Sequence, residues 1–138
     1  MENRTTSRFI IIDDDPINNH ICRKYIEIIF PGAEIADFTN PQSGIEYILT
    51  AYSAPTRHDT VLLLDINMPV LSGWEVLDIF AHFPETIKDQ FNIYILSSSI
   101  DSEDKRKADS SPLISGFIEK PLSTSQLQTA IAHMHISA

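Results

Sequence analysis

The sequence has a single cysteine, Cys22, which lies within an apolar helical pattern. A lone thiol cannot form an internal disulfide and is too little for a cysteine-based zinc site, so we expect a buried, unreactive side chain. No stretch reaches about 18 consecutive apolar residues, and residues 1–8 lack the apolar segment of a signal peptide. These absences argue against a membrane-spanning or exported protein, and a reducing cytoplasm is the expected location.

Basic residues are also scarce, with 10 Lys and Arg against 19 Asp and Glu, a net charge of −9 and a pI near 4.8. Such a surface does not suit nucleic-acid phosphates, and it favours a basic protein partner or a bound cation. The length of 138 residues fits one domain, residues 1–138, with a sizeable core. We expect residues 1–7 to be flexible, and the last helical pattern ends too close to Ala138 to leave room for a second domain.

Five apolar runs of strand length alternate with helical patterns. The runs cover residues 9–12, 33–38, 61–64, 93–96 and 113–118. The first, third and fourth runs are continuously apolar, as in parallel strands covered on both faces, whereas the second and fifth alternate, as edge strands do. This alternation predicts an α/β protein with an open, five-stranded parallel sheet and helices on both faces.

Helical patterns lie between these runs. Apolar spacing predicts helices near 17–29, 45–52 and 73–83, and a capping box that begins at Ser123 opens the last helix. The segment 101–109 has no apolar stripe, so it predicts a solvated surface helix or a loop.

Polar side chains follow four of the five runs. Asp13 and Asp14 come after the first run, Asp65 after the third, Ser97 after the fourth and Lys120 after the fifth. Ligands of parallel α/β sheets bind outside the carboxyl ends of the strands. If the first and third strands are neighbours, the three aspartates converge on one spot.

A cluster of this kind needs a cation. Carboxylates about 4 Å apart repel by roughly 4 kcal/mol per pair at an effective dielectric near 20. Three aspartates and one lysine leave a charge of −2, which a single divalent cation neutralises. Ligands that are all oxygen atoms select a hard ion, so we expect Mg²⁺ or Mn²⁺.

The same residues suit phosphoryl chemistry. Asp65 stands alone at the end of a central strand and is the best candidate nucleophile, whereas the pair Asp13 and Asp14 is better arranged to hold metal. Lys120 and the cation would stabilise charge on the transferring oxygens, and the Ser97 hydroxyl could donate to another oxygen.

Four motifs, in this order, resemble those of the receiver domains of two-component response regulators. They are Asp-Asp-Asp-Pro at 13–16, Asp-Ile-Asn-Met-Pro at 65–69 with Gly73 beyond it, Ile-Leu-Ser-Ser at 95–98, and Phe-Ile-Glu-Lys-Pro at 117–121. The resemblance extends over nearly the whole chain. It implies a flavodoxin-like (βα)₅ fold with strand order 2-1-3-4-5, in a stand-alone receiver without an output domain of its own.

The resemblance also implies roles. Asp65 would accept a phosphoryl group from a phosphohistidine on a sensor histidine kinase or a histidine phosphotransfer protein. Asp14, Asp65 and the main-chain carbonyl of Asn67 would bind Mg²⁺, with Asp13 acting through water. The only turnover would be Mg²⁺-dependent self-phosphorylation and self-dephosphorylation, so the protein would not be an enzyme in the usual sense.

The remaining motif positions would form the switch. Lys120 would pair with the phosphoryl group, and its bond to Pro121 would be cis. Ser97 would move toward the phosphoryl oxygen, and Phe117 would turn inward and change an interaction face for an unknown output protein. Ser at 97 replaces the more frequent Thr, and Phe at 117 the common Tyr, which removes a hydroxyl from that face.

Two alternatives stay open at this point. A haloacid-dehalogenase-type phosphohydrolase also forms an aspartyl-phosphate, and Asp13-x-Asp15 superficially suits it, but Ile17 and the short chain do not. The second alternative is a degenerate receiver that only binds partners. The intact aspartates and Lys120 argue against it. The sequence leaves the oligomeric state, the cognate kinase and the role of the long loop 53–60 open.

Overall fold

A computed structural model describes residues 6–54, 59–98, 101–120 and 122–131. It contains a five-stranded parallel sheet in the order β2-β1-β3-β4-β5, so the predicted fold class and strand order are confirmed. The strands are β1 (Thr6–Ile12), β2 (Glu34–Phe38), β3 (Asp59–Asp65), β4 (Phe91–Ser97) and β5 (Ile114–Glu119). The helices are α1 (Pro16–Ile29), α2 (Pro41–Ala51), α3 (Gly73–Ala81), α4 (Glu85–Lys88), α5 (Ser102–Ser110) and α6 (Thr124–Ile131). Most of segment 1–7, half of loop 53–60 and the whole of Pro121 lie outside the described residues.

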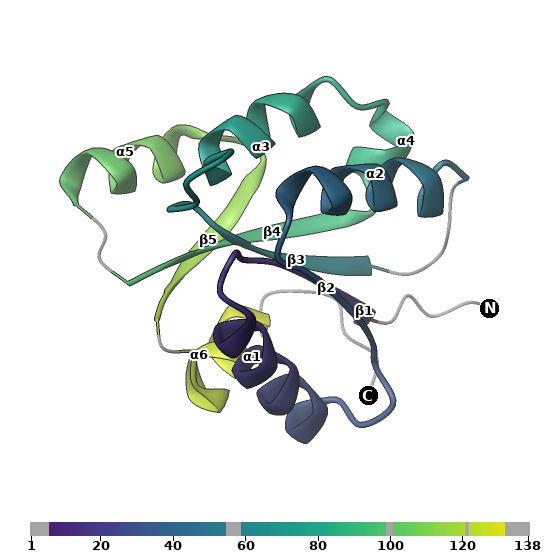
Figure 1. Ribbon diagram of the computed structural model, residues 1–138, viewed down its shortest axis with the longest axis vertical. Helices are drawn as coiled ribbons and strands as arrows, with labels where there is room; N and C mark the ends of the chain where they lie inside the picture. Colours follow the sequence, from purple (N-terminus) through teal and green to yellow (C-terminus); the bar gives the residue numbers. More distant parts are fainter. Residues whose placement is uncertain (1–5, 55–58, 99–100, 121, 132–138) are drawn as a thin grey trace.

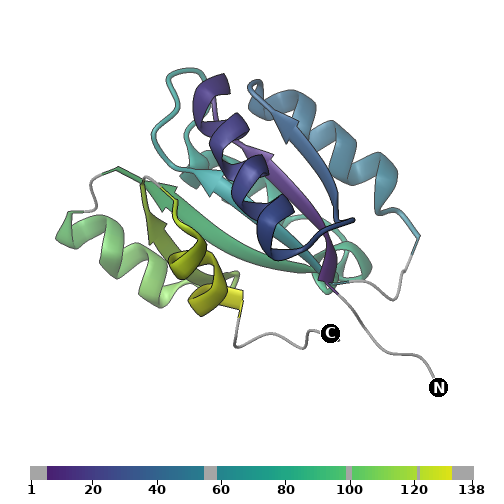
Figure 2. The ribbon, with the colours of Figure 1, turned by 90° about the horizontal axis from the view of Figure 1, so that it is seen from below.

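The helices form two layers, with α1 and α6 on one face of the sheet and α2, α3, α4 and α5 on the other (Figures 1 and 2). The alternation of side chains along β1 explains this division. Ile10 and Ile12 pack into the core beneath α2 and α3, whereas Phe9 and Ile11 pack against α1 and α6. A strand with both faces covered must be apolar throughout, which is why the continuous runs predicted the central strands.

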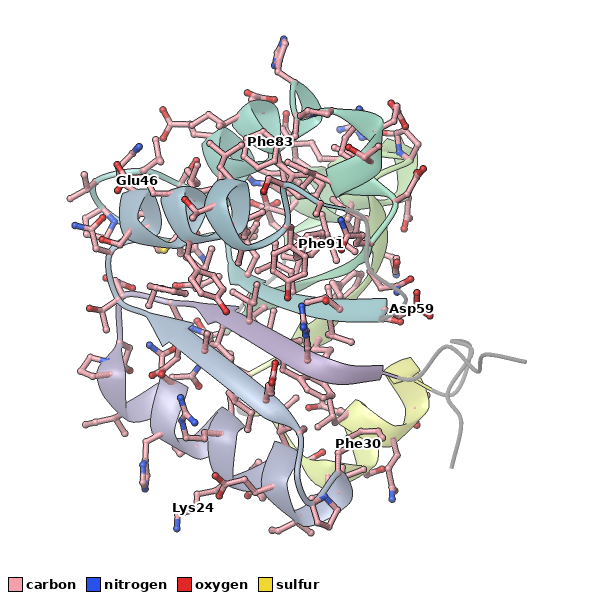
Figure 3. All side chains as sticks on the ribbon, turned by 90° about the vertical axis from the view of Figure 1, so that its right-hand side faces the viewer. Lys24, Phe30, Glu46, Asp59, Phe83 and Phe91 are labelled. Carbon is pink, nitrogen blue, oxygen red and sulfur yellow. The ribbon has the colours of Figure 1, made fainter. Side chains whose placement is uncertain are left out.

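Side chains fill both layers, as Figure 3 shows. Phe83 and Phe91 lie on the α3 and α4 side of the sheet, and Phe30 lies on the α1 side. Lys24 of α1 and Glu46 of α2 extend away from the core and are exposed. Cys22 is fully buried, as predicted, and this burial raises the pKa of its thiol to about 12.

Segment 101–109 was predicted as a solvated surface helix or a loop, and it forms the mostly exposed helix α5. Asp101 caps this helix by accepting from the Asp104 N–H at 2.8 Å. Helix α4 was not predicted. It spans a single turn after Pro84, so it has no apolar periodicity, and the burial of Ile87 holds it to the core. In the described part of the chain, no helix is long and apolar enough to cross a membrane.

Candidate acidic site at the carboxyl edge of the sheet

The register of the sheet brings the predicted polar residues together. Ile12 of β1 pairs with Leu64 of β3, and Asp65 pairs with Leu96 of β4. The next residues along these strands are therefore Asp13, Asp65 and Ser97. The Lys120 main-chain N–H donates to the Ser97 carbonyl at 2.8 Å, which ties the end of β5 to the same edge.

Lys120 lies between two of the aspartates. Its ammonium is 2.7 Å from Asp13 Oδ2 and 3.5 Å from Asp65 Oδ1. Burial by itself would lower the pKa of Lys120, but the hydrogen bond to Asp13 and the charges of both carboxylates outweigh it, so the net effect raises the pKa. Lys120 therefore carries its positive charge at neutral pH, closer to Asp13 than to Asp65.

Asp65 is almost fully buried, with a side chain that is 4% exposed. Burial raises its pKa from 3.8 to about 6; the Asn67 N–H opposes that rise, Asp13 adds to it and Lys120 opposes it. The Asn67 N–H donates to Oδ1 at 3.1 Å, so Oδ1 has both the amide and Lys120 beside it. Among the described residues, neither a hydrogen bond nor an ion pair engages Asp65 Oδ2. The two oxygens of this carboxylate therefore have different surroundings.

Asp13, Asp14 and Asp65 form a cluster whose carboxylate oxygens lie within 4.8 Å of one another. Asp13 and Asp65 are buried and Asp14 is exposed, so the cluster opens to solvent on the Asp14 side. With Lys120 the charge of the group is −2, and all of the donors are oxygens. This donor set fits a hard divalent cation such as Mg²⁺.

Asp13 is completely buried and both of its carboxylate oxygens are engaged. Oδ1 accepts from the Asp15 N–H at 2.9 Å, and Oδ2 accepts from both Lys120 and the Asn18 side-chain amide, each at 2.7 Å. The neighbouring Asn19 amide donates to the Asp13 main-chain oxygen at 3.1 Å. Neither asparagine was predicted as a site residue. Two adjacent polar residues on the buried side of α1, directly after the acidic run, could have indicated that they contact the site.

Ser97 and Phe117 lie on neighbouring strands. Ser97 is fully buried, and its hydroxyl accepts from the Asn67 side-chain amide at 3.3 Å. Phe117 pairs with Ile95 in the sheet and is half-buried, with the Lys105 ammonium 5.6 Å from the centre of its ring. The cis bond predicted before Pro121 falls outside the described residues.

Close packing explains why the motif that begins at Asp65 includes a glycine, Gly73. A Cβ atom at this position would lie 2.6 Å from the Asp65 main-chain oxygen and 2.6 Å from the Ile66 Cα. Such contacts are too short for any other residue, so glycine lets the first turn of α3 approach the end of β3. The Gly73 N–H donates to the Ile66 carbonyl at 3.2 Å and fixes the intervening loop.

Comparison with known proteins agrees with this geometry. The response regulator receiver domain family matches residues 9–132, and the protein belongs to this family. Stress response regulator protein 1 of Meyerozyma guilliermondii is 35% identical over 74 residues, which are 54% of this chain and 32% of that protein. The chain thus matches about a third of the length of this curated relative.

Solved structures give the same fold over nearly the whole chain. A two-component response regulator from Cytophaga hutchinsonii is 30% identical with a TM-score of 0.82, covering 94% of this chain and 96% of that one. A response regulator receiver protein from Dyadobacter fermentans is 25% identical with a TM-score of 0.81, covering 94% and 98%. The predicted family is therefore confirmed, and the roles of individual site residues remain predictions.

Proposed function

We propose that this protein is a phosphorylation-controlled signalling receiver that accepts a phosphoryl group on Asp65. The donor would be a phosphohistidine of a sensor histidine kinase or a histidine phosphotransfer protein. The observation that carries the proposal is the asymmetry of Asp65, whose Oδ1 is held by Asn67 and Lys120 while Oδ2 is left open among the described residues. A buried carboxylate fixed in this way is oriented as a nucleophile.

The transfer itself needs few groups. Asp65 Oδ2 attacks the phosphorus atom, the bond between phosphorus and the imidazole nitrogen breaks, and that nitrogen keeps the electron pair and takes up a proton from solvent. Lys120, only 3.5 Å from Oδ1, then pairs with the new phosphoryl oxygens. The product is an aspartyl-phosphate at the edge of the sheet.

Mg²⁺ or Mn²⁺ fits beside this carboxylate. Asp14 and Asp65 would hold the ion with the Asn67 main-chain carbonyl, and Asp13 would reach it through water. When bound, the ion neutralises negative charge on the phosphoryl oxygens. Asp13 has both oxygens engaged by protein donors, which supports an indirect role for it.

The output is an altered protein-interaction face. Ser97 would move toward the phosphoryl group and Phe117 would follow it inward, and these movements would change the surface near α5 and β5. The effect would reach an output protein in the cytoplasm, without nucleic-acid or membrane binding by this domain.

The position of Asp15 argues against the dehalogenase-type alternative. That reading requires Asp15 as a catalytic residue, but the exposed Asp15 side chain accepts from the Ile17 N–H at 2.9 Å and caps α1. A helix cap of this kind accounts for Asp15 without any catalytic role.

The test is phosphorylation of the purified protein with Mg²⁺ and acetyl phosphate, followed by intact-mass measurement. We expect the mass of one phosphoryl group to be added, chelation of the metal to abolish labelling, and Asp65→Asn to abolish it as well. Asp109→Asn, on the exposed side of α5, is the matched control and should label like the parent. Labelling that survives in Asp65→Asn, or steady turnover of p-nitrophenyl phosphate, would overturn the proposal.

A further inference from the structure

The buried Asp13 carboxylate has more donors than one lysine. Lys120 and Asn18 each lie 2.7 Å from the same oxygen, Oδ2, while the Asp15 N–H serves Oδ1. A carboxylate oxygen can accept two hydrogen bonds, so both donors can be present together. They differ in mobility, because one ends a long, flexible side chain and the other belongs to a short side chain on a helix.

Asn18 is built into α1. It is 7% exposed, and its amide lies 3.7 Å from Cys22 Sγ one turn further along the helix. The side chain is therefore enclosed between the Asp13 carboxylate and the apolar core. It cannot follow Lys120 if Lys120 moves.

Phosphoryl transfer to Asp65 requires such a movement. Lys120 is closer to Asp13 than to Asp65, at 2.7 Å against 3.5 Å, so it must leave Asp13 at least in part to pair with phosphoryl oxygens. A buried carboxylate that loses its donors is strongly destabilised. Some group has to stay with Asp13 when the lysine moves.

We propose that Asn18 is a positioning residue that keeps Asp13 hydrogen-bonded and so allows Lys120 to move from Asp13 to the phosphoryl group. This inference rests on the proposed function of Asp65. Without the Asn18 amide, Asp13 would hold Lys120 more tightly, and the lysine would be less available to the reacting oxygens.

The test uses Asn18→Leu, which keeps the size of the side chain and removes the donor, and Asn18→Ala, which removes the donor without adding bulk. Loss of a hydrogen bond to a buried charge should slow phosphorylation by acetyl phosphate at saturating donor about tenfold. The acetyl phosphate concentration at half-maximal rate should stay within about twofold of the parent value, as expected when an interaction made mainly in the transition state is lost. Mg²⁺ affinity, measured by calorimetry without phosphodonor, should also be unchanged, because Asp14 and Asp65 remain.

Asn19 provides the matched control. It is also buried, at 1% exposure, but its amide donates to the main-chain oxygens of Asp13 and Phe38. Asn19→Ala should lower thermal stability as much as Asn18→Ala, yet leave the rate per folded molecule at the parent value.

The outcomes separate the two proposals. A parent protein that is not labelled contradicts the function of Asp65 and this inference with it. A labelled parent with an unchanged rate in both Asn18 variants overturns the role of Asn18 alone. Equal losses in Asn18→Ala and Asn19→Ala would also overturn it, because they would mean that Asn18 is only a packing residue.

Discussion

Helices α1 and α5 both begin after a strand that ends at the acidic edge, yet different forces attach them to the sheet. Each starts with an aspartate N-cap, Asp15 in α1 and Asp101 in α5. Helix α1 places Cys22 and Ile26 completely inside the core. In α5, all of whose residues are described, Ala108 is the only buried one.

Contacts with two aromatic rings take the place of apolar burial in α5. The Lys107 ammonium lies 5.2 Å from the centre of the Trp74 ring, and Lys105 lies 5.6 Å from that of Phe117. The Trp74 indole N–H also donates to Asp104 at 3.3 Å. Exposed cation–π contacts contribute roughly 0.5–1 kcal/mol each, against roughly 1.5–3 kcal/mol for a buried aliphatic side chain.

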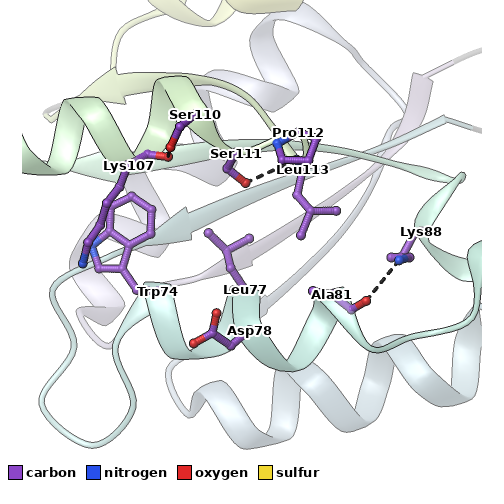
Figure 4. Close-up of a pocket in the computed structure, with 10 residues that line it drawn as sticks. All are labelled: Trp74, Leu77, Asp78, Ala81, Lys88, Lys107, Ser110, Ser111, Pro112 and Leu113. Carbon is purple, nitrogen blue, oxygen red and sulfur yellow. Dashed lines mark hydrogen bonds between the residues drawn. The ribbon is translucent and has the colours of Figure 1, made fainter.

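A groove of about 640 Å³ between α3 and α5 adds to this difference. Leu77 and Leu113 line it, Lys107 lies beside Trp74 at one end, and Lys88 donates to the Ala81 carbonyl at the other (Figure 4). Helix α5 therefore has open space beneath part of its length. Helix α1 is thus held beside the acidic site by buried side chains, and we expect α5, with little apolar burial, to shift at smaller cost.

The largest expected change in stability concerns the buried side chains of α1. Ile26→Ala should lower the free energy of unfolding by about 3 kcal/mol, since it removes fully buried methyl groups and leaves a cavity. Urea unfolding measures it. Lys107→Ala in α5 should cost less than about 1 kcal/mol. Similar losses in the two helices would contradict the comparison.

Metal binding at the acidic site should stabilise the folded protein. Because the three carboxylates lie so close together, Mg²⁺ should stabilise the protein by about 2.7 kcal/mol at roughly a hundredfold excess over its dissociation constant. Asp14→Ala should reduce the gain in melting temperature, and Asp109→Ala should not. A melting temperature that does not respond to Mg²⁺ would mean that the cluster does not bind it.

Without metal, pH should change stability through Asp65. Its pKa is raised from 3.8 to about 6 in the folded protein, so its contribution is fully present below about pH 4 and is lost as the pH rises through 6. The loss should be on the order of 3 kcal/mol by pH 7, and Asp65→Asn should remove that fall. Denaturant unfolding in chelator at several pH values provides the measurement. If the parent and the variant have the same pH profile, Asp65 is not the group responsible.

The sequence predicted the strands and the acidic cluster better than the side-chain contacts of the helices. Continuous apolar runs specify buried parallel strands, and carboxylates placed at strand ends must meet at one edge, so the acidic cluster followed from local pattern and sheet topology. The contacts of Asn18 with Asp13 and of Lys105 with Phe117 could not be predicted, because they join side chains whose proximity depends on how helices pack. Helix α4 was missed because a single turn has no periodicity.

The switch should be visible in α5 once Asp65 is phosphorylated. Ser97→Ala should still accept the phosphoryl group, but it lacks the hydroxyl that would bind it, so the change in amide exchange over Ser102–Ser110 and Ile114–Glu119 should be smaller than in the parent. Loss of one hydrogen bond, worth about 1 kcal/mol, would reduce the shift by roughly fivefold. A response as large as that of the parent would mean that the serine is not the trigger.

The smallest expected effect concerns the lysines that hold α5. Lys107→Gln removes the positive charge over the Trp74 ring but keeps most of the side chain, so it should weaken the attachment by about 0.5 kcal/mol. Amide exchange in Ser102–Ser110 should then become about twofold faster, with little change in global unfolding. Lys24→Gln, at an exposed lysine of α1, is the matched control and should leave exchange in both helices unchanged. Since the cation–π contact is electrostatic, high salt should reduce the difference between Lys107→Gln and the parent. If exchange in α5 is the same in Lys107→Gln and the parent at low salt, the contact between Lys107 and Trp74 does not help to hold the helix.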